Sequence, residues 1–130
     1  MNVVVTGAGG FVGRNLCVAL GRRDDVALFP CDLATDPALL AHALAVADVV
    51  FHLAGVNRPE DPAEFETSNA GFTREVCRQL GAAGRRAKMV FASSIQAALD
   101  NTYGRSKLGA EQALGVWSPR IRARDRCVTV

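Results

Sequence analysis

Three glycines that separate an apolar strand from an apolar helix constrain this chain more than any other feature. Residues 3–6 read Val-Val-Val-Thr, and this β-branched run suits a strand that is covered on both faces. The glycines lie within residues 7–13, where Phe11 and Val12 already begin a helical pattern without a linker. The connection must therefore be a tight turn that joins a buried strand directly to a helix.

Each glycine has its own task in such a turn. Gly7 can take backbone angles that other residues avoid, Gly10 lets the main chain approach a pyrophosphate, and Gly13 lets the helix pack closely on the strand. A phosphate would rest on the helix N-terminus, where free N–H groups and the helix dipole favour an anion. The Gly-x-x-Gly-x-x-Gly spacing thus predicts a dinucleotide-binding turn, with Phe11 and Val12 as further cofactor contacts.

The rest of the chain alternates between strand and helix patterns. We expect helices over residues 11–20, 38–47, 63–80 and from about 102, and strands over 26–29, 48–53, 88–92 and 127–130. This alternation predicts an α/β fold with a doubly wound parallel sheet of the Rossmann type, in three α/β/α layers, incomplete at the C-terminus. With 130 residues the chain has room for one core, so residues 1–130 are expected to form a single NAD(P)-binding domain.

Composition and charge exclude several other classes of protein. The net charge of +2 does not favour nucleic acid, and the arginines between residues 120 and 126 are interpreted as a solvated face. No apolar run approaches membrane-spanning length, and no leader precedes the first strand, so we expect a cytoplasmic protein without a membrane contact. The four cysteines are scattered without a Cys-x-x-Cys pair, which predicts free, buried thiols and no metal site. They are Cys17, Cys31, Cys77 and Cys127.

Asp32 is the candidate residue for the adenosine end of a dinucleotide. It follows the second strand, 19 residues beyond Gly13, where a carboxylate commonly accepts hydrogen bonds from the ribose hydroxyls and repels the 2′-phosphate of NADP. Two other interpretations stay open: the Asp-Leu-x-Asp segment that touches the adenine ring, and a helix cap before Pro37, for which Asp36 is the better candidate.

The next strand ends in small residues that suit a ligand. Leu53, Ala54 and Gly55 are predicted to lie against the cofactor ribose and pyrophosphate. His52 is interpreted as a half-buried strand residue and not as a catalytic group. In the polar loop that follows, Asn57 and Arg58 are candidate substrate contacts, although a surface ion pair of Arg58 with a neighbouring acid is an equal alternative.

A serine pair and a tyrosine–lysine pair are the candidates for chemistry. Ser93 and Ser94 end the strand over 88–92, either for catalysis or to complete strand hydrogen bonds. Tyr103 and Lys107 lie four residues apart, on one face of the last helix. A phenol with a pKa of about 10 is a poor acid–base catalyst at neutral pH, but a nearby ammonium favours the phenolate. The spacing therefore predicts a catalytic pair.

Taken together, these motifs resemble the extended short-chain dehydrogenase/reductases of the NAD-dependent epimerase/dehydratase family. The likeness covers residues 1 to about 114 and rests on the segments 6–13, 48–55, 93–94 and 103–107. Within that family, segments 52–60, 93–97 and 100–104 look most like the capsular-polysaccharide nucleotide-sugar reductases. Those reduce the 4-keto group of a UDP-linked deoxy-hexosamine with NADPH.

The resemblance implies roles for individual residues. Tyr103 would give a proton to the sugar oxygen, Lys107 would hold the cofactor ribose, and Ser94 would orient the carbonyl. Gln96 would contact the substrate where dehydratases have an acid, which favours reduction or epimerisation over dehydration. Asn69 matches a position packed near the tyrosine helix. The resemblance also allows a homodimer formed through that helix.

Two departures from the family leave expectations open. Asp32 stands where the NADPH-using relatives have a basic residue, so either NADP or NAD remains open as the cofactor. Most of the substrate-binding half that family members carry after the tyrosine helix is missing, so the chain reads as a truncated reductase with weak turnover. The alternatives are a nucleotide-sugar epimerase, and a non-catalytic NAD(P)-binding module or inactive fragment.

Overall fold

A five-stranded parallel sheet forms the centre of the structure, a computed structural model that describes residues 1–56, 60–84, 86–117 and 127–129. The strands follow the order β2-β1-β3-β4-β5 across the sheet. They span Asn2–Thr6 (β1), Ala27–Cys31 (β2), Val49–His52 (β3), Lys88–Phe91 (β4) and Cys127–Thr129 (β5). The chain leaves β1 toward β2 and then returns to the other side of β1 for β3, so the winding direction reverses beside β1. In open α/β sheets this reversal is the place where ligands bind.

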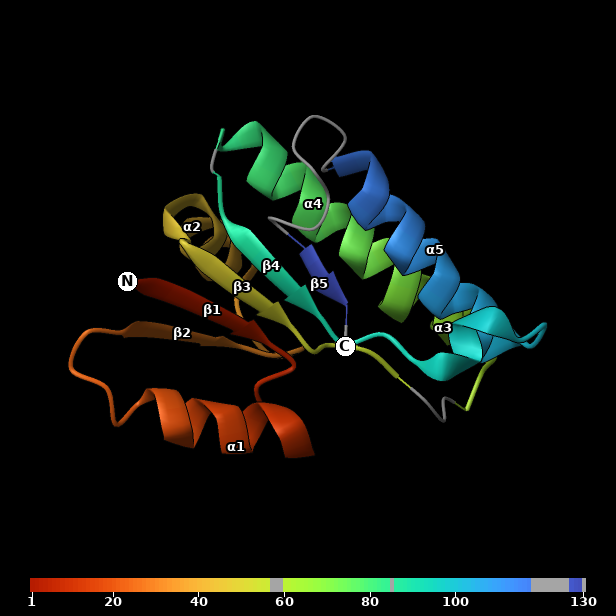
Figure 1. Cartoon of the computed structure of the whole chain (residues 1–130), viewed down its shortest axis with the longest axis horizontal. Coiled ribbons are helices and arrows are strands. Elements are labelled where there is room, and N and C mark those ends of the chain that lie inside the picture. The colour runs from red at the N-terminus through yellow and green to blue at the C-terminus, as the bar shows by residue number, and fades with distance from the viewer. Residues whose placement is uncertain (57–59, 85, 118–126, 130) are drawn as a thin grey trace.

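The helices cover the two faces of the sheet unequally. Helix α1 (Phe11–Leu20) lies on one face, whereas α2 (Pro37–Val46), α4 (Phe72–Ala82) and α5 (Thr102–Trp117) lie on the other (Figure 1). Right-handed crossovers account for this arrangement, because β1→β2 and β2→β3 run across the sheet in opposite directions. The predicted three-layer α/β/α architecture is confirmed.

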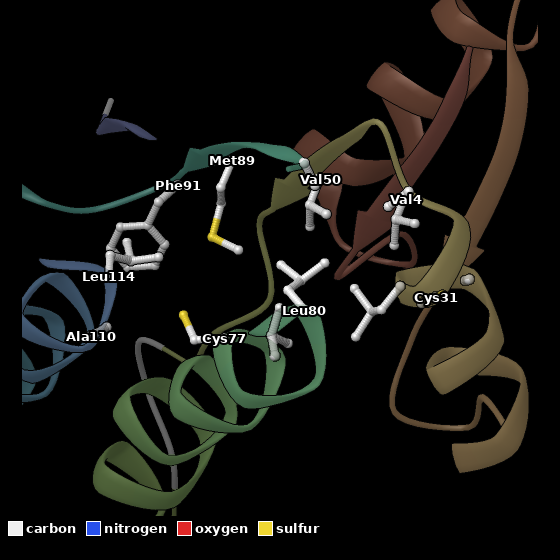
Figure 2. Close-up of a cluster of buried hydrophobic side chains, with 14 residues drawn as sticks. Val4, Cys31, Val50, Cys77, Leu80, Met89, Phe91, Ala110 and Leu114 are labelled. Atoms are coloured by element: carbon white, nitrogen blue, oxygen red, sulfur yellow. The ribbon is translucent and has the colours of Figure 1, made fainter. Parts of the chain in front are cut away.

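The main hydrophobic core fills the space between the sheet and the layer formed by α2, α4 and α5. Val4, Val50 and Met89 stand in register on neighbouring strands, so their side chains share one face. Leu80 of α4 and Leu114 of α5 pack toward them (Figure 2). This layer therefore holds α5, with its two candidate catalytic residues, at a fixed place over the sheet.

Helix α1 packs on the turn through its glycine. Gly13 is the residue of this helix that is buried. Phe11 is 87% exposed and Val12 is 62% exposed, so their side chains are open to a ligand at this end of the helix. The close contact with the turn is therefore made by Gly13 and not by a bulky side chain.

The helix expected over residues 63–80 is interrupted. It consists of a short turn α3 (Ala63–Phe65), a π-helical segment η1 (Glu66–Gly71) and α4. Asn69 lies in η1 and is buried. A π-helical segment widens the helix by one residue per turn, and such segments occur frequently at functional sites.

The second strand extends beyond its expected end and includes Pro30. Pro30 stands in register with Val5 of β1. Proline is tolerated there because β2 is an edge strand of the sheet in the described residues, so one side of the strand needs no N–H donor.

Candidate functional site

The glycine turn is closed by steric contacts that leave no room for a Cβ atom. Gly7 has a φ of 71°, and a Cβ there would lie 2.7 Å from the Ala54 N atom. A Cβ on Gly13 would collide with the Gly7 carbonyl oxygen, and the Gly10 N–H donates to that same oxygen at 3.1 Å. The turn is therefore folded tightly on itself and on the end of β3, as the spacing predicts.

The N-terminus of α1 faces the carboxyl edge of the sheet. Its N-cap is Gly10, which forms no side-chain cap, and the first turn carries no acidic residue. The first N–H groups of the helix are thus available to an anion, and the helix dipole favours one. Phe11 and Val12 flank this end with exposed side chains, and their contact with a cofactor remains a prediction.

Asp32 lies directly against the glycine turn. It follows β2, and one carboxylate oxygen accepts from the Leu33 N–H at 2.8 Å. The other oxygen is so close to Gly9 that a Cβ there would collide with it. Asp36, not Asp32, caps α2 by accepting from the Ala38 N–H at 2.7 Å. The helix-cap interpretation of Asp32 is therefore excluded, and its contact with the ribose stays a prediction.

The end of β3 joins the glycine turn to the tyrosine helix. The Ala54 N–H donates to the Thr6 hydroxyl at 3.3 Å, beside the contact with Gly7. A Cβ on Gly55 would lie 2.7 Å from Asn69 Oδ1 and 3.1 Å from Lys107 Nζ. The small residues that follow Leu53 thus allow the two parts of the site to approach each other.

Helix α5 begins with a cap that sets the position of Tyr103. Asn101 Oδ1 accepts from the Gly104 N–H at 2.7 Å, which is the N-cap arrangement. A Cβ on Gly104 would collide with the carbonyl oxygen of Gln96, so this first turn packs directly on η2 (Ile95–Ala98). The Tyr103 ring stands 5.6 Å from the Phe65 ring.

Lys107 is a buried cation held beside Tyr103. It is 5% exposed, and its Nζ donates to the Ala92 carbonyl at 3.0 Å. The Nζ atom lies 5.9 Å from the centre of the Tyr103 ring and 5.2 Å from that of Phe91. Burial lowers the pKa of Lys107, because an ammonium loses its hydration inside the protein. The structure therefore brings the two residues of the predicted catalytic pair together.

Ser94 and Gln96 occupy the loop between β4 and α5. The Ser94 hydroxyl accepts from the Gln96 N–H at 3.2 Å and caps η2, so in the described residues it bonds to this N–H and not to Tyr103. Gln96 is exposed, and its Oε1 accepts from Asn101 Nδ2 at 3.5 Å. The other two predicted substrate residues, Asn57 and Arg58, lie outside the described residues.

Several side chains of the site were not found by sequence reasoning. Glu111, one turn beyond Lys107, accepts a hydrogen bond from Ser93 and ties α5 to the end of β4. Ser106, which the sequence did not single out, accepts at its Oγ from Asn69 Nδ2 at 2.9 Å, and this contact places Asn69 against the tyrosine helix as expected. His52 is fully buried, so its interpretation as half-buried is wrong. The position of Glu111, four residues after Lys107 on the same helix face, was the available signal for that residue.

Within the described part of the chain, no group of three His, Cys, Asp or Glu side chains converges to hold a metal ion. None of the described helices combines the length and apolarity that crossing a bilayer requires. Cys31 and Cys77 are buried as predicted, whereas Cys17 is partly exposed; the side chain of Cys127 lies outside the described residues.

Comparison with known proteins gives a family match and much longer relatives. Residues 3–118 match the model of the NAD dependent epimerase/dehydratase family. The chain is 45% identical over 116 residues to the UDP-2-acetamido-2,6-beta-L-arabino-hexul-4-ose reductase of Pseudomonas aeruginosa, covering 89% of this chain and 31% of that protein. The chain therefore spans about a third of the length of this relative.

Solved structures resemble the fold closely. The capsular polysaccharide assembling protein CapF from Staphylococcus aureus superposes with a TM-score of 0.78 at 39% identity, over 99% of this chain and 34% of that one. The UDP-glucuronic acid 4-epimerase from Bacillus cereus, solved in complex with NAD, gives a TM-score of 0.77 at 21% identity, over 92% of this chain and 53% of that one. The second likeness concerns the fold alone.

Proposed function

The chain belongs to the NAD-dependent epimerase/dehydratase family, and we propose that it forms the cofactor half of an enzyme that reduces the 4-keto group of a UDP-linked deoxy-hexose. The observation that carries this proposal is the juxtaposition of Tyr103 with the buried ammonium of Lys107, next to Gly55 at the end of β3. The relatives named as a reductase and as a capsular polysaccharide assembling protein support the reaction and its setting in polysaccharide precursor synthesis.

The residues present fit a dinucleotide. Three features converge at the carboxyl edge of the sheet: a glycine-rich turn at a helix N-terminus, the Asp32 carboxylate beside Gly9, and the Lys107 ammonium beside Gly55. The turn suits a pyrophosphate, the carboxylate suits ribose hydroxyls, and the ammonium can donate to the second ribose. A bound reduced nicotinamide supplies the hydride of the reaction.

In the proposed mechanism, the residues of α5 and η2 handle the proton and the carbonyl. Tyr103 holds the proton that passes to the sugar oxygen, and Lys107 adds positive charge beside the phenol. Ser94 lies at the end of β4, where its hydroxyl can turn from the Gln96 N–H to the substrate carbonyl. Gln96 has no acidic proton, which supports reduction over elimination of water.

Asp32 supports NAD as the preferred cofactor. Its carboxylate lies at the end of β2, and a like charge there opposes the 2′-phosphate of NADP. A nucleotide-sugar epimerase is the second candidate, but the named epimerase relative shares 21% identity, against 45% for the named reductase. We therefore place reduction first.

The outer groove between α4 and α5 supports a homodimer. It has a volume of about 310 Å³, and its apolar members include Val116, which is 78% exposed. Arg74 and Arg78 also line the groove, and an apolar groove rimmed by polar side chains is typical of protein–protein contact sites. Sedimentation of the purified chain would test this part of the proposal, and a monomer at all concentrations would reject it.

The reaction is tested in a longer protein that carries this segment together with the remaining length of the relatives. Turnover of a UDP-linked 4-keto sugar with NADH is the expected activity. Tyr103→Phe should lower kcat by roughly a hundredfold with little change in NADH affinity, because the phenol acts on the proton and not on cofactor binding. Arg105→Ala, an exposed residue of the same helix paired with Asp100, is the matched control. Unchanged turnover in Tyr103→Phe would reject the proposed acid.

A further inference from the structure

A fully buried histidine lies between the glycine turn and the tyrosine helix. His52 ends β3 and is 0% exposed. Its ring is stacked on Phe91 at 5.7 Å and tilted against Phe72 at 5.5 Å. Both ring nitrogens nevertheless have polar partners, so the imidazole is packed among aromatic rings and also fully hydrogen-bonded.

The partners of His52 determine which nitrogen carries the proton. The Thr73 hydroxyl donates its hydrogen to the Asn69 carbonyl at 2.8 Å, so it can only accept from His52 Nε2, which lies 2.9 Å away. In a neutral ring Nδ1 is then unprotonated and accepts from the Thr6 hydroxyl at 2.7 Å. The Thr6 oxygen in turn accepts from the Ala54 N–H. The hydrogen bonds of this network run in one direction, from Ala54 after β3 through Thr6 and His52 to Thr73 of α4 and the Asn69 carbonyl of η1.

Asn69 extends this hydrogen-bond network to the tyrosine helix. Its side chain binds both main-chain groups of Val56, accepting from N–H at 2.9 Å and donating to C=O at 3.0 Å. It also donates to Ser106 Oγ, which donates to the Tyr103 carbonyl at 2.7 Å. Buried hydrogen bonds thereby fix the positions of η1, Gly55 and α5 relative to one another.

We propose that His52, held as the neutral Nε2–H tautomer, is a positioning residue that couples the glycine turn to the Tyr103–Lys107 pair through Thr73 and Asn69. Thr6 immediately precedes Gly7, and Asn69 Oδ1 stands against Gly55 beside Lys107 Nζ. A break at Thr73 leaves His52 Nε2 without its partner in the interior and removes one of the donors to the Asn69 carbonyl, which displaces the wall that Gly55 and Lys107 share.

The electrostatic surroundings agree with a neutral ring. Burial, and to a smaller extent the charge of Lys107, lower the pKa of His52 to about 4. Phe72, Thr73, Thr6 and Phe91 face the ring from α4, β1 and β4, and Lys107 faces it from α5. An added proton on Nδ1 would remove the acceptor of the Thr6 hydroxyl hydrogen and reverse this hydrogen bond.

The first test is independent of cofactor binding. Long-range ¹⁵N–¹H correlation spectra of the purified chain report the protonation of each imidazole nitrogen. We expect a protonated Nε2 and a bare Nδ1 for His52 at pH 7, unchanged down to pH 5. A protonated Nδ1, or a ring that titrates near its ordinary value, would overturn the proposal.

The second test rests on the proposed dinucleotide binding and uses NADH fluorescence. Thr73→Val should weaken NADH affinity roughly tenfold, the equivalent of one lost buried hydrogen bond. Thr73→Ser, which restores the hydroxyl, should restore the affinity. Thr67→Val is the matched control. Thr67 lies in the same interrupted helix, but it is exposed and takes no part in the hydrogen-bond network of His52.

The outcomes separate the two proposals. Wild-type affinity in a folded Thr73→Val would overturn the positioning role. An equal loss of NADH affinity in Thr67→Val would also overturn it. The loss would then come from any change in this helix and not from the hydrogen-bond network of His52. Absence of NADH binding by the wild type would reject the proposed function, and the ring spectra would still decide the role of His52.

Discussion

The two halves of the candidate site depend on different kinds of residue, glycines in one half and buried polar side chains in the other. In the β1–α1–β2 half, the turn is shaped by missing side chains: Gly7 fits against Ala54, Gly13 against the Gly7 carbonyl, and α1 buries Gly13. In the half formed by β3, β4, η1 and α5, buried polar side chains such as His52 and Asn69 hold the elements by hydrogen bonds. The first half should therefore be sensitive to added atoms, and the second to lost polar partners.

The largest effect is expected where an atom is added to the glycine turn. Gly7→Ala should lower the free energy of unfolding by about 3 kcal/mol or more, because it combines a positive φ with a collision against the main chain of Ala54. Gly84 also has a positive φ, but no atom lies within 4 Å of the Cβ position. Gly84→Ala should therefore lower the free energy of unfolding by about 1–2 kcal/mol. Gly81 lies inside α4 with open space around the Cβ position. Gly81→Ala should raise the free energy of unfolding by about 0.5–1 kcal/mol, because alanine is favoured over glycine inside a helix. Urea unfolding of the three variants gives the ranking, and equal losses in Gly7→Ala and Gly84→Ala would remove the steric argument.

A pH change should act on the polar half. The pKa of His52 is about 4 in the folded protein, below its ordinary value of 6.5, so the unfolded chain binds the proton first. The free energy of unfolding should be at its full value above pH 6.5 and fall by about 3 kcal/mol as the pH drops through 6.5 to 4. In His52→Gln, the free energy of unfolding measured by chemical denaturation should no longer decrease in this way between pH 6.5 and 4.5. The same slope in both proteins would show that other groups cause it.

Removing the buried ammonium should separate binding from stability. Lys107→Met should weaken NADH affinity roughly tenfold, since a donor near the cofactor is lost. The variant should be as stable as the wild type or more stable at pH 7, because burial lowers the pKa of Lys107 and the charge is costly to bury. Lys88→Met, at an exposed position of β4, should change neither quantity. A large loss of stability in Lys107→Met would show that the ammonium has a structural role.

The smallest expected effect concerns the cofactor's adenosine end. Asp32→Ala should reduce the preference for NADH over NADPH by about fivefold, since the repulsion of a 2′-phosphate would be removed in a solvent-exposed position. Asp36→Ala, which removes the cap of α2, should lower stability by about 1 kcal/mol without changing the preference. Competition titrations with both cofactors measure this ratio, and an unchanged ratio in Asp32→Ala would reject the ribose contact.

The contrast between the halves also explains what the sequence could predict. The order of strands and helices, the glycine turn and the Tyr103–Lys107 spacing follow from local patterns, because spacing along a strand or helix determines which side chains share a face. The turn depends on glycine, which leaves a direct signal in the sequence.

The polar half leaves a weaker signal. His52 and Thr73 are 21 residues apart, Asn69 and Ser106 are 37 apart, and each pair meets only after the sheet has formed. A histidine in an apolar strand gives no indication of such partners, so its full burial and its tautomer could not be predicted. The π-helical segment at Asn69 was missed for the same reason, since tertiary contacts with α5 and Val56 stabilise it.

The central claim is that the carboxyl edge of this sheet is a dinucleotide site, and titration of the purified chain with NADH and NADPH tests it most directly. Nicotinamide fluorescence reports binding without requiring turnover. We predict saturable binding of both cofactors, tighter for NADH, and a strong loss in Gly13→Val, whose side chain would enter the turn. No fluorescence change with either cofactor would contradict the assignment of the glycine turn.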